Sequence, residues 1–485
     1  MRENRMEQAE AMETVDLERV RAAQREWAET DLRVRLRVIR ELRKRMASGA
    51  RELTEAVPLE MPGALHRTGA ETLISEVLSL MEACRFLERE SGRILRTKKL
   101  GWLGRPVWLF GIEAEVERVP WGVVLLLGAA NYPLFLAGVQ CLQALAAGNA
   151  VLWKPAPGTA AAVLAFRLLL VESGLQPELL TILDTSVAAA EEAIAGGVDF
   201  VVLTGAAETG KAVLRQLAET LTPAIMELSG CDAVFVLPGA DMDRTARALR
   251  FGLRFNGSNT CMAPRRVFLV GLDEAQAVAF EARLTAALAE LTPVASPART
   301  RALVGELVED ARARGAEVAL DGAATLILKA TPAMRAMRTD VFAPLLSVMR
   351  TVDVNEALAA NAACPYALSA SIFGPEEQAR SLASRLKVGN VLINDVITPT
   401  VDPRITFGGR NRSGFGVTRG AEGLLAMTTP RTIQVQRSRS TWTYDPVDER
   451  HEELFVGLAE LLHGDGLRAR IRGLTRLMGA ARRLK

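Results

Sequence analysis

Residues 254–264 (RFNGSNTCMAP) contain the side chain best suited to nucleophilic chemistry, Cys261. A thiolate is intrinsically very nucleophilic, but an unperturbed thiol is only a few per cent ionised at neutral pH. A nucleophilic cysteine therefore needs electropositive surroundings, an oriented backbone and a nearby base. The alternative is a buried structural cysteine, the usual role of a lone cysteine in a reduced chain.

Histidine, the commonest partner of a catalytic cysteine, is scarce in this chain. Only His66, His451 and His463 are present, and the last two lie near the C-terminus. We therefore expect neither a Cys-His or Ser-His-Asp arrangement nor a histidine-rich metal site, and no bound metal. If Cys261 is a nucleophile, its base should be a carboxylate.

The elements that would position such a carboxylate begin at Gly122, where short apolar runs alternate with helical patterns. This alternation predicts a doubly wound parallel sheet, whose ligands lie at the carboxyl ends of the strands. Asn131, Lys154, Thr204 and Glu227 lie at or just after predicted strand ends, so we expect them to converge. The predicted strands are 123–127, 150–153, 179–183, 200–203 and 224–228.

A second alternating unit follows Gly230 and holds the Cys261 loop between a helix at 242–254 and a strand at 267–270. The fold class we predict is α/β, with two doubly wound parallel-sheet domains and a β-hairpin arm. The arm is residues 106–120, where apolar and acidic side chains alternate, and it suits pairing with another subunit. Further strands are predicted at 233–237, 326–328, 345–348, 369–373, 391–394 and 432–435.

The tail from Asp448 is predicted to be helical. Two interpretations stay open: a helix on an anionic membrane surface, or a helix docked on the body with a solvated basic face, which we favour. Its apolar stripe and its basic residues are Leu467, Ile471, Leu474 and Met478, and Arg468, Arg470, Arg472, Arg476, Arg482, Arg483 and Lys485.

The composition limits the classes of partner and compartment. The chain has 485 residues, 59 basic and 57 acidic, for a net charge of +2, so no bulk attraction to nucleic acid is expected. Five widely spaced cysteines without a CxxC pair indicate a reduced, cytoplasmic protein. We expect no signal peptide in residues 1–16 and no membrane span in residues 121–139.

Residues 205–212 (GAAETGKA) resemble a phosphate-binding loop between a strand and a helix. That motif requires Ser or Thr after its lysine to bind magnesium, and Ala212 stands there instead. No GxGxxG is present either. A loop that brings a helix N-terminus to a pyrophosphate fits these residues better than a nucleoside triphosphatase does.

From about residue 22 to residue 435 the chain resembles the aldehyde dehydrogenase superfamily. The acid and the thiol are separated by 34 residues (261 − 227), and the order of the motifs is that of the family. The motifs are PWGVV from Pro120, NYP from Asn131, ALAAGNAVLWKP from Ala144, LTGAAETGK from Leu203, ELSG from Glu227, VFAP from Val341, FGG from Phe407 and SGFG from Ser413.

The resemblance implies a role for each matching residue. Cys261 would attack the aldehyde carbon, and Asn131 would donate to the oxyanion. Glu227 would activate the water that releases a carboxylate. Lys154 would bind the adenosine ribose, and the remaining cofactor-binding residues would be Pro157, Gly205, Gly210, Asp340 and Phe342.

The chain departs from the family pattern at several positions. Ser258 and Asn259 replace Gly-Gln before the nucleophile, Asp340 replaces a longer Glu, Ala206 replaces Ser and Cys231 replaces Lys. Pro157 stands where NAD-preferring members often carry Glu, so NAD or NADP is expected as cofactor. The alternatives are a relative that transfers the acyl group to coenzyme A, and a nucleotide-binding protein that has lost catalysis.

The family also implies a domain plan and a homodimer or homotetramer. A small-molecule aldehyde is the expected substrate. Peripheral contact of the C-terminal tail with a membrane is a further possible interaction. The expected domains are a cofactor domain (1–104 and 121–229), an oligomerisation arm (105–120 and 431–440), a catalytic domain (230–430) and a basic helical C-terminal extension (441–485).

Overall fold

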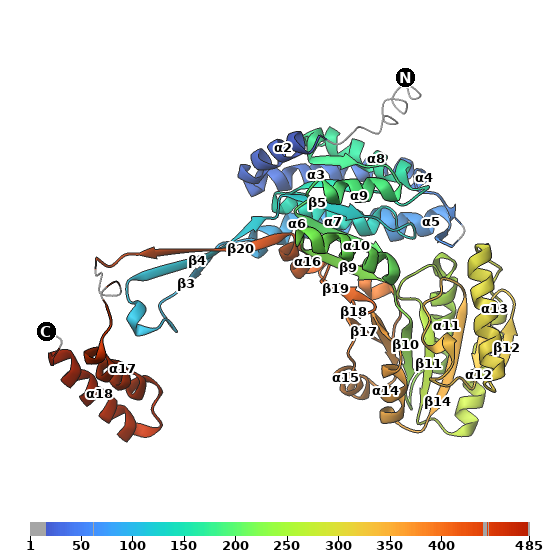
Figure 1. Cartoon of the computed structure of the whole chain (residues 1–485). Coiled ribbons are helices and arrows are strands. Elements are labelled where there is room, and N and C mark those ends of the chain that lie inside the picture. The colour runs from blue at the N-terminus through green and yellow to red at the C-terminus, as the bar shows by residue number, and fades with distance from the viewer. Residues whose placement is uncertain (1–15, 62, 440–443, 445, 484–485) are drawn as a thin grey trace. The chain divides into compact units, whose positions relative to one another are not determined.

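A computed structural model describes residues 16–61, 63–439, 444 and 446–483 (Figure 1). The chain forms two compact units. Unit 1 comprises Met1–Thr97 and Glu117–Arg431, and unit 2 comprises Lys98–Val116 and Thr432–Lys485. Within the described ranges, no helix combines the length and the apolarity needed to cross a membrane.

The first sheet of unit 1 has six strands in the order β19-β9-β8-β5-β6-β7. Neighbours from β9 to β7 run parallel, and β19 pairs antiparallel with β9 at the edge. The strand order reverses between β5 and β8, which is where doubly wound sheets bind their ligands. The strands are β5 (Val123–Leu127), β6 (Ala150–Lys154), β7 (Leu180–Ile182), β8 (Phe200–Gly205), β9 (Ala224–Leu228) and β19 (Gly414–Phe415).

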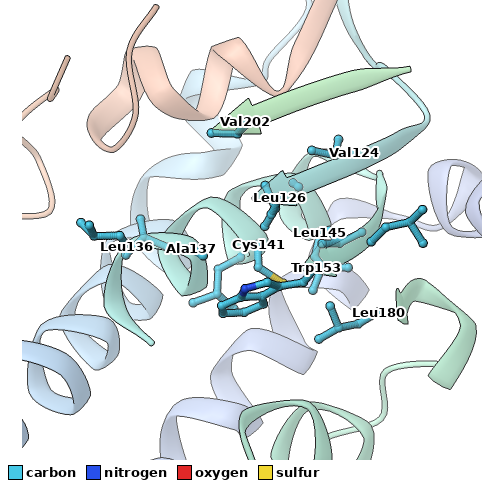
Figure 2. Packing of buried hydrophobic residues seen from close by; sticks show 14 of the residues in the cluster. Val124, Leu126, Leu136, Ala137, Cys141, Leu145, Trp153, Leu180 and Val202 are labelled. Atoms are coloured by element: carbon cyan, nitrogen blue, oxygen red, sulfur yellow. The ribbon is translucent and has the colours of Figure 1, made fainter. Parts of the chain in front are cut away.

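Helix α7 (Phe135–Ala147) lies at the centre of this half of unit 1. All of its residues are buried, because its sequence is mostly apolar and carries no charged residue to turn to water. Figure 2 shows the indole of Trp153, from β6, among side chains of β5, α7 and β7, which include Leu126, Cys141, Leu145 and Leu180. Trp153 in turn meets Phe166 edge to face, with ring centroids 6.0 Å apart.

Other helices cover the first sheet. Asp16 and Asp31 cap α2 and α3 by accepting backbone N–H bonds from Arg19 and Arg33, as acidic N-caps do. These helices are α2 (Leu17–Glu29), α3 (Leu32–Ser48), α4 (Ala50–Glu55), α5 (Gly69–Thr72), η1 (Leu73–Leu78), α6 (Ser79–Ile94), α8 (Ala160–Glu172), α9 (Val187–Ala195), α10 (Ala207–Thr220) and α16 (Gly420–Ala426).

The second sheet has seven strands in the order β12-β13-β14-β11-β10-β16-β17, parallel except for β12. Helix α11 (Met242–Arg254) leads into the Cys261 loop, and β11 (Pro264–Val270) leaves it. The predicted α/β fold class is thus confirmed. The other strands are β10 (Asp232–Val236), β12 (Glu317–Asp321), β13 (Thr325–Leu328), β14 (Leu345–Thr351), β16 (Ser369–Phe373) and β17 (Asn390–Ile393), and the helices are α12 (Glu274–Ala289), α13 (Ala298–Ala313), α14 (Val354–Ala362) and α15 (Glu376–Ala383).

The arm is a three-stranded sheet in the order β20-β4-β3, made of β3 (Lys98–Leu100), β4 (Ile112–Pro120) and β20 (Thr428–Gln436). The expected extended hairpin over 106–120 is corrected in one respect. Residues Val107–Leu109 form a 3₁₀ turn, and β4 pairs with β3, which precedes that turn. Two further helices of unit 2, α17 (Glu449–His463) and α18 (Gly466–Arg483), pack against each other.

Candidate active site

A cavity of about 520 Å³ opens in unit 1 at the carboxyl ends of the first sheet. Asn131 follows β5, Lys154 ends β6, Thr204 lies in β8 and Glu227 lies in β9. All four line the cavity, and so does Cys261 from the loop before β11. The structure therefore brings together the residues that the sequence predicts to converge.

The Cys261 loop is held by a left-handed turn. Asn256, Gly257 and Ser258 have φ values of 53°, 59° and 66°. Among these, Asn and Gly adopt this conformation most readily. The Asn256 side chain fixes the turn, because its Nδ2 donates to the carbonyls of Ala64 (3.1 Å) and Asn131 (3.2 Å). Sequence reasoning missed Asn256, although an Asn-Gly pair is a signal for such a turn.

Ser258 takes a positive φ that is unusual for a residue with a side chain, and Arg265 stabilises it there. The buried guanidinium donates 2.6 Å hydrogen bonds to both the hydroxyl and the carbonyl oxygen of Ser258. A further bond of 2.8 Å reaches the Ala343 carbonyl. The departure from Gly at this position is thus accommodated by a buried cation that fixes the loop.

Asn131 is tied to the same loop. Its Nδ2 donates to the Asn259 carbonyl at 3.0 Å, and the hydroxyl of the adjacent Tyr132 lies 2.9 Å from the Thr260 hydroxyl. The Gly230 N–H donates to the Cys261 carbonyl at 3.2 Å. An amide NH₂ and a half-buried thiol therefore share one wall of the cavity.

A buried carboxylate orients the segment that carries Asn131. Both oxygens of Glu76 are used: Oε2 accepts the backbone N–H groups of Leu134 (3.1 Å) and Phe135 (2.7 Å) at the start of α7. Oε1 pairs with Arg67 at 2.6 Å. An anion at a helix N-terminus is favourable, so this pair anchors the turn between β5 and α7.

Glu227 is 3 % exposed and only one of its oxygens is held. Oε2 accepts from the Thr418 hydroxyl (3.1 Å) and from the Gln140 amide (3.3 Å). Oε1 has no partner among the described residues. Burial raises the pKa of Glu227, and the nearby Arg419 opposes that shift. The unpartnered oxygen can accept a proton, and a raised pKa makes this carboxylate a stronger base than an ordinary Glu.

The Cys261 thiol also resists ionisation. Burial, followed by the negative charge of Glu227, raises the pKa of this thiol, while Arg419 lowers it. The surroundings of Cys261 thus disfavour the thiolate overall, and Arg419 is a buried positive charge that opposes this effect. The thiol should rest protonated and lose its proton to a base when it attacks.

Arg419 was not anticipated from the sequence. It is 5 % exposed, lies over the Phe407 ring at 4.3 Å and the Phe135 ring at 5.6 Å, and donates to the Thr400 carbonyl at 2.6 Å. No carboxylate forms an ion pair with it in the part of the chain that the structure describes. Its charge therefore acts on Glu227 and Cys261 without a partner in contact.

The expected cofactor residues divide into two groups. Lys154, Pro157, Gly205, Asp340 and Phe342 line the cavity. Gly210 is outside the cavity lining. It lies in the first turn of α10, where an added Cβ would meet Leu228 Cδ1 at 3.0 Å, so the structure gives this glycine a packing role.

Several open polar groups fit a dinucleotide in this cavity. Helix α10 begins beside Gly205, and its N-cap, Ala206, makes no side-chain capping bond. A helix N-terminus of this kind binds phosphate through its free N–H groups. Asp340 accepts a bond from the Ser229 hydroxyl through Oδ2, and its buried Oδ1 has no partner among the described residues. The residues present therefore fit the cofactor that the sequence predicts.

Comparisons with known proteins show which family the chain belongs to. Residues 4–433 match the model of the Aldehyde dehydrogenase family. The chain is 30% identical over 462 residues to the 4,4'-diapolycopene aldehyde oxidase of Methylomonas sp, covering 90% of this chain and 85% of that protein. It is 29% identical over 445 residues to a Deinococcus radiodurans succinate-semialdehyde dehydrogenase [NADP(+)], and the match covers 86% of this chain and 89% of that protein.

Solved structures show the same architecture. The NADP-dependent glyceraldehyde-3-phosphate dehydrogenase of Bacillus halodurans, complexed with NADP, superposes with a TM-score of 0.77 at 25% identity, over 87% of this chain and 90% of that one. The chain therefore belongs to the aldehyde dehydrogenase family, a family of oxidoreductases, as its motifs predict.

Proposed function

We propose that this protein oxidises an aldehyde to a carboxylate through a thiohemiacetal and then a thioester on Cys261. Its cofactor is NAD or NADP. The observation that carries the proposal is the convergence of Cys261, Asn131 and Glu227 on one cavity at the switch point of the first sheet.

The first step would be attack of the Cys261 sulfur on the aldehyde carbon, with the thiol proton passing to the unpartnered Oε1 of Glu227. The amide of Asn131 and the backbone N–H of Cys261 would donate to the oxygen as it becomes negative. Losing one such donor typically costs about 3 kcal/mol of barrier. In the free protein the Asn131 amide is bonded to the Asn259 carbonyl, so it keeps a fixed position until substrate arrives.

Lys154, Asp340 and the N-terminus of α10 would hold the cofactor, and Phe342 would flank its nicotinamide. When bound, the cofactor supplies the hydride acceptor of the oxidation. Pro157 offers no carboxylate that would repel a ribose 2′-phosphate, so both NAD and NADP should be accepted. The Deinococcus relative, named as NADP-dependent, supports acceptance of NADP.

The second step would be hydrolysis of the thioester. The unpartnered Oε1 of Glu227 is free to accept a proton from water, while Gln140 and Thr418 hold Oε2. This arrangement favours release of free acid over transfer of the acyl group to coenzyme A, because it supplies a base for water.

We also propose a homodimer or homotetramer built through the arm. The loop between β3 and β4 exposes large apolar side chains, with Trp102, Leu103 and Phe110 at 75%, 79% and 84% exposure. Apolar side chains gathered in one loop mark an interaction site. A second copy of the chain would cover them.

The reaction is tested by incubating the protein with NAD or NADP and a panel of aldehydes that includes succinate semialdehyde and 4,4'-diapolycopene aldehyde, which the names of the Deinococcus and Methylomonas relatives mention. Absorbance reports the reduced cofactor, and product analysis separates free acid from acyl-coenzyme A. Turnover that is lost in Cys261→Ala supports the proposal. Cofactor binding without turnover of any aldehyde would instead identify a protein that has lost catalysis.

A further inference from the structure

The two C-terminal helices form a hairpin that fixes how α18 is turned (Figure 1). Two glycines let the helices approach closely. A Cβ on Gly473 would lie 2.3 Å from the Leu461 nitrogen, and one on Gly457 would lie 2.6 Å from the Leu477 nitrogen. The face of α18 that carries Gly473 and Leu477 is therefore the face that packs on α17.

The apolar stripe of α18 lies on a different face and is exposed. Leu467, Ile471, Leu474 and Met478 are 74%, 54%, 43% and 50% exposed. At about 3.6 residues per turn these positions line up along one side of the helix. The predicted stripe is thus present, and α17 leaves it open to solvent.

Arginines border this stripe on both sides. With the same helical period, Arg470 lies along one edge, and Arg468 and Arg482 lie along the other. Residues 466–483 contain no Asp or Glu. In the described part of the chain, neither Arg468 nor Arg482 has an acidic partner.

The acids of α17 are directed to other arginines. Glu460 Oε1 lies 3.2 Å from Arg472 Nε and 3.3 Å from Arg476 Nη1, and Glu453 Oε2 lies 3.5 Å from Arg476 Nε. These two arginines are on the α17 side of the helix. Within the hairpin, Arg472 and Arg476 are thus paired with acids of α17. Arg468 and Arg482 remain available to bind a partner of negative charge.

We propose that α18 binds the surface of an anionic phospholipid membrane, with its apolar stripe in the acyl boundary and Arg468, Arg470 and Arg482 at the headgroups. An amphipathic helix with arginines at the edges of an apolar stripe lies in the membrane interface in this way. The six arginines in its 18 residues favour lying on the bilayer over insertion across it. The inference does not depend on the proposed reaction.

The experiment is co-sedimentation of the full chain with vesicles of phosphatidylcholine alone and with vesicles of equimolar phosphatidylcholine and phosphatidylglycerol. We expect binding to the anionic vesicles that weakens as salt is added, since salt screens surface charges. The affinity of the double variant Ile471→Gln/Met478→Gln for these vesicles should fall by about tenfold or more, because two apolar side chains are no longer transferred from water into the membrane. Leu168→Gln/Val278→Gln is the matched control, with 51% and 49% exposure in unit 1, and should bind like the parent.

The charge contribution is tested with a second matched pair. Arg468→Gln/Arg482→Gln should lose roughly fivefold in affinity for each arginine removed from the surface. Arg472→Gln/Arg476→Gln removes the same charge from the α17 side and should lose much less. Circular dichroism would verify that each variant keeps its helices.

The proposal is overturned if the parent does not bind anionic vesicles, or if both members of each matched pair bind alike. Light scattering tests the alternative that a second copy of the chain, and not a membrane, covers the apolar stripe. If Ile471→Gln/Met478→Gln has a lower molar mass in solution than the parent, and the parent does not bind vesicles, the stripe contacts a second copy of the chain.

Discussion

Glu227 and Arg419 come from different elements, and their charges shift the pKa of the Cys261 thiol in opposite directions. Burial raises the pKa of the Glu227 carboxyl, and the positive charge of Arg419 limits that rise. A general base must be ionised to act, so thioester hydrolysis should become faster as pH rises through the Glu227 pKa. The midpoint of that rise should lie above the usual Glu value of about 4.3.

The contribution of Arg419 is tested by comparing two substitutions. Arg419→Met should move the midpoint to higher pH, since the opposing charge is gone, whereas Arg419→Lys should leave it near the parent value. Single-turnover hydrolysis of the acyl-enzyme, followed across pH, gives the midpoint directly. Equal midpoints in the two variants would show that the charge of Arg419 does not act on the base.

The raised pKa of Glu227 also makes the free energy of unfolding depend on pH. The folded pKa of Glu227 lies above its unfolded pKa, so the folded state binds the proton more tightly. The resulting stability is present below the unfolded pKa and is lost as pH rises through the folded pKa. Glu227→Gln should therefore raise the melting temperature relative to the parent in alkaline buffer and not in acid. A constant difference across pH would contradict this account.

For single residues, the sequence predicted which candidate side chains meet at the cavity but not what surrounds them. Cys261, Glu227 and Asn131 stand in recognisable motifs. Gln140 and Arg419 are in no recognisable motif, because Gln140 lies within an apolar helix and Arg419 follows a glycine-rich loop. Only the folded chain brings them to the carboxylate.

At the scale of elements, β19 shows how a glycine supports the site. Gly414 pairs with Glu227 across the edge of the first sheet, with a φ of 95°. A Cβ at this position would lie 1.8 Å from the Met226 carbonyl oxygen. No side chain fits there without displacing β9 and the Glu227 it carries.

Gly414→Ala should therefore cost roughly 3 kcal/mol or more of unfolding free energy, in the range of severe backbone effects, and should lower activity. Gly92→Ala is the control. Gly92 lies in α6 with nothing within 4 Å of an added Cβ, so alanine should stabilise the protein by about 0.5–1 kcal/mol. Urea unfolding of both variants measures the difference, and similar values would refute the steric argument.

The sequence predicted most elements of the two sheets, since buried parallel strands are short apolar runs with clear ends. The predicted ranges of β5, β9, β16 and α11 agree with the structure. It missed β12, β3 and β19, because β12 is an edge strand with exposed ends, β3 is wholly exposed and β19 has only two residues. Their formation depends on partners distant in the sequence.

At the scale of the whole molecule, the arm and α18 present separate exposed apolar surfaces with different expected partners. The arm loop is aromatic, and we assign it to a second subunit. Trp102→Ser/Phe110→Ser should lower the mass in solution measured by light scattering, because a partner would no longer bury these side chains. The Ile471→Gln/Met478→Gln variant should keep the parent mass. An unchanged mass in the arm variant would remove the arm from the interface.

In the proposed mechanism Cys261 carries an acyl group, and water activated by Glu227 releases it; trapping the acyl-enzyme is therefore the decisive experiment. Because the thiol proton would then have to leave to water, Glu227→Gln should form the thioester more slowly than the parent, and it should hydrolyse the thioester more slowly still. After mixing with aldehyde and cofactor, the intact mass should rise by one acyl group, and peptide mapping should place that group on Cys261. Cys261→Ser in the same background should show no thioester. Reduction of the cofactor without any adduct on Cys261, or an adduct on another cysteine, would contradict the proposed mechanism.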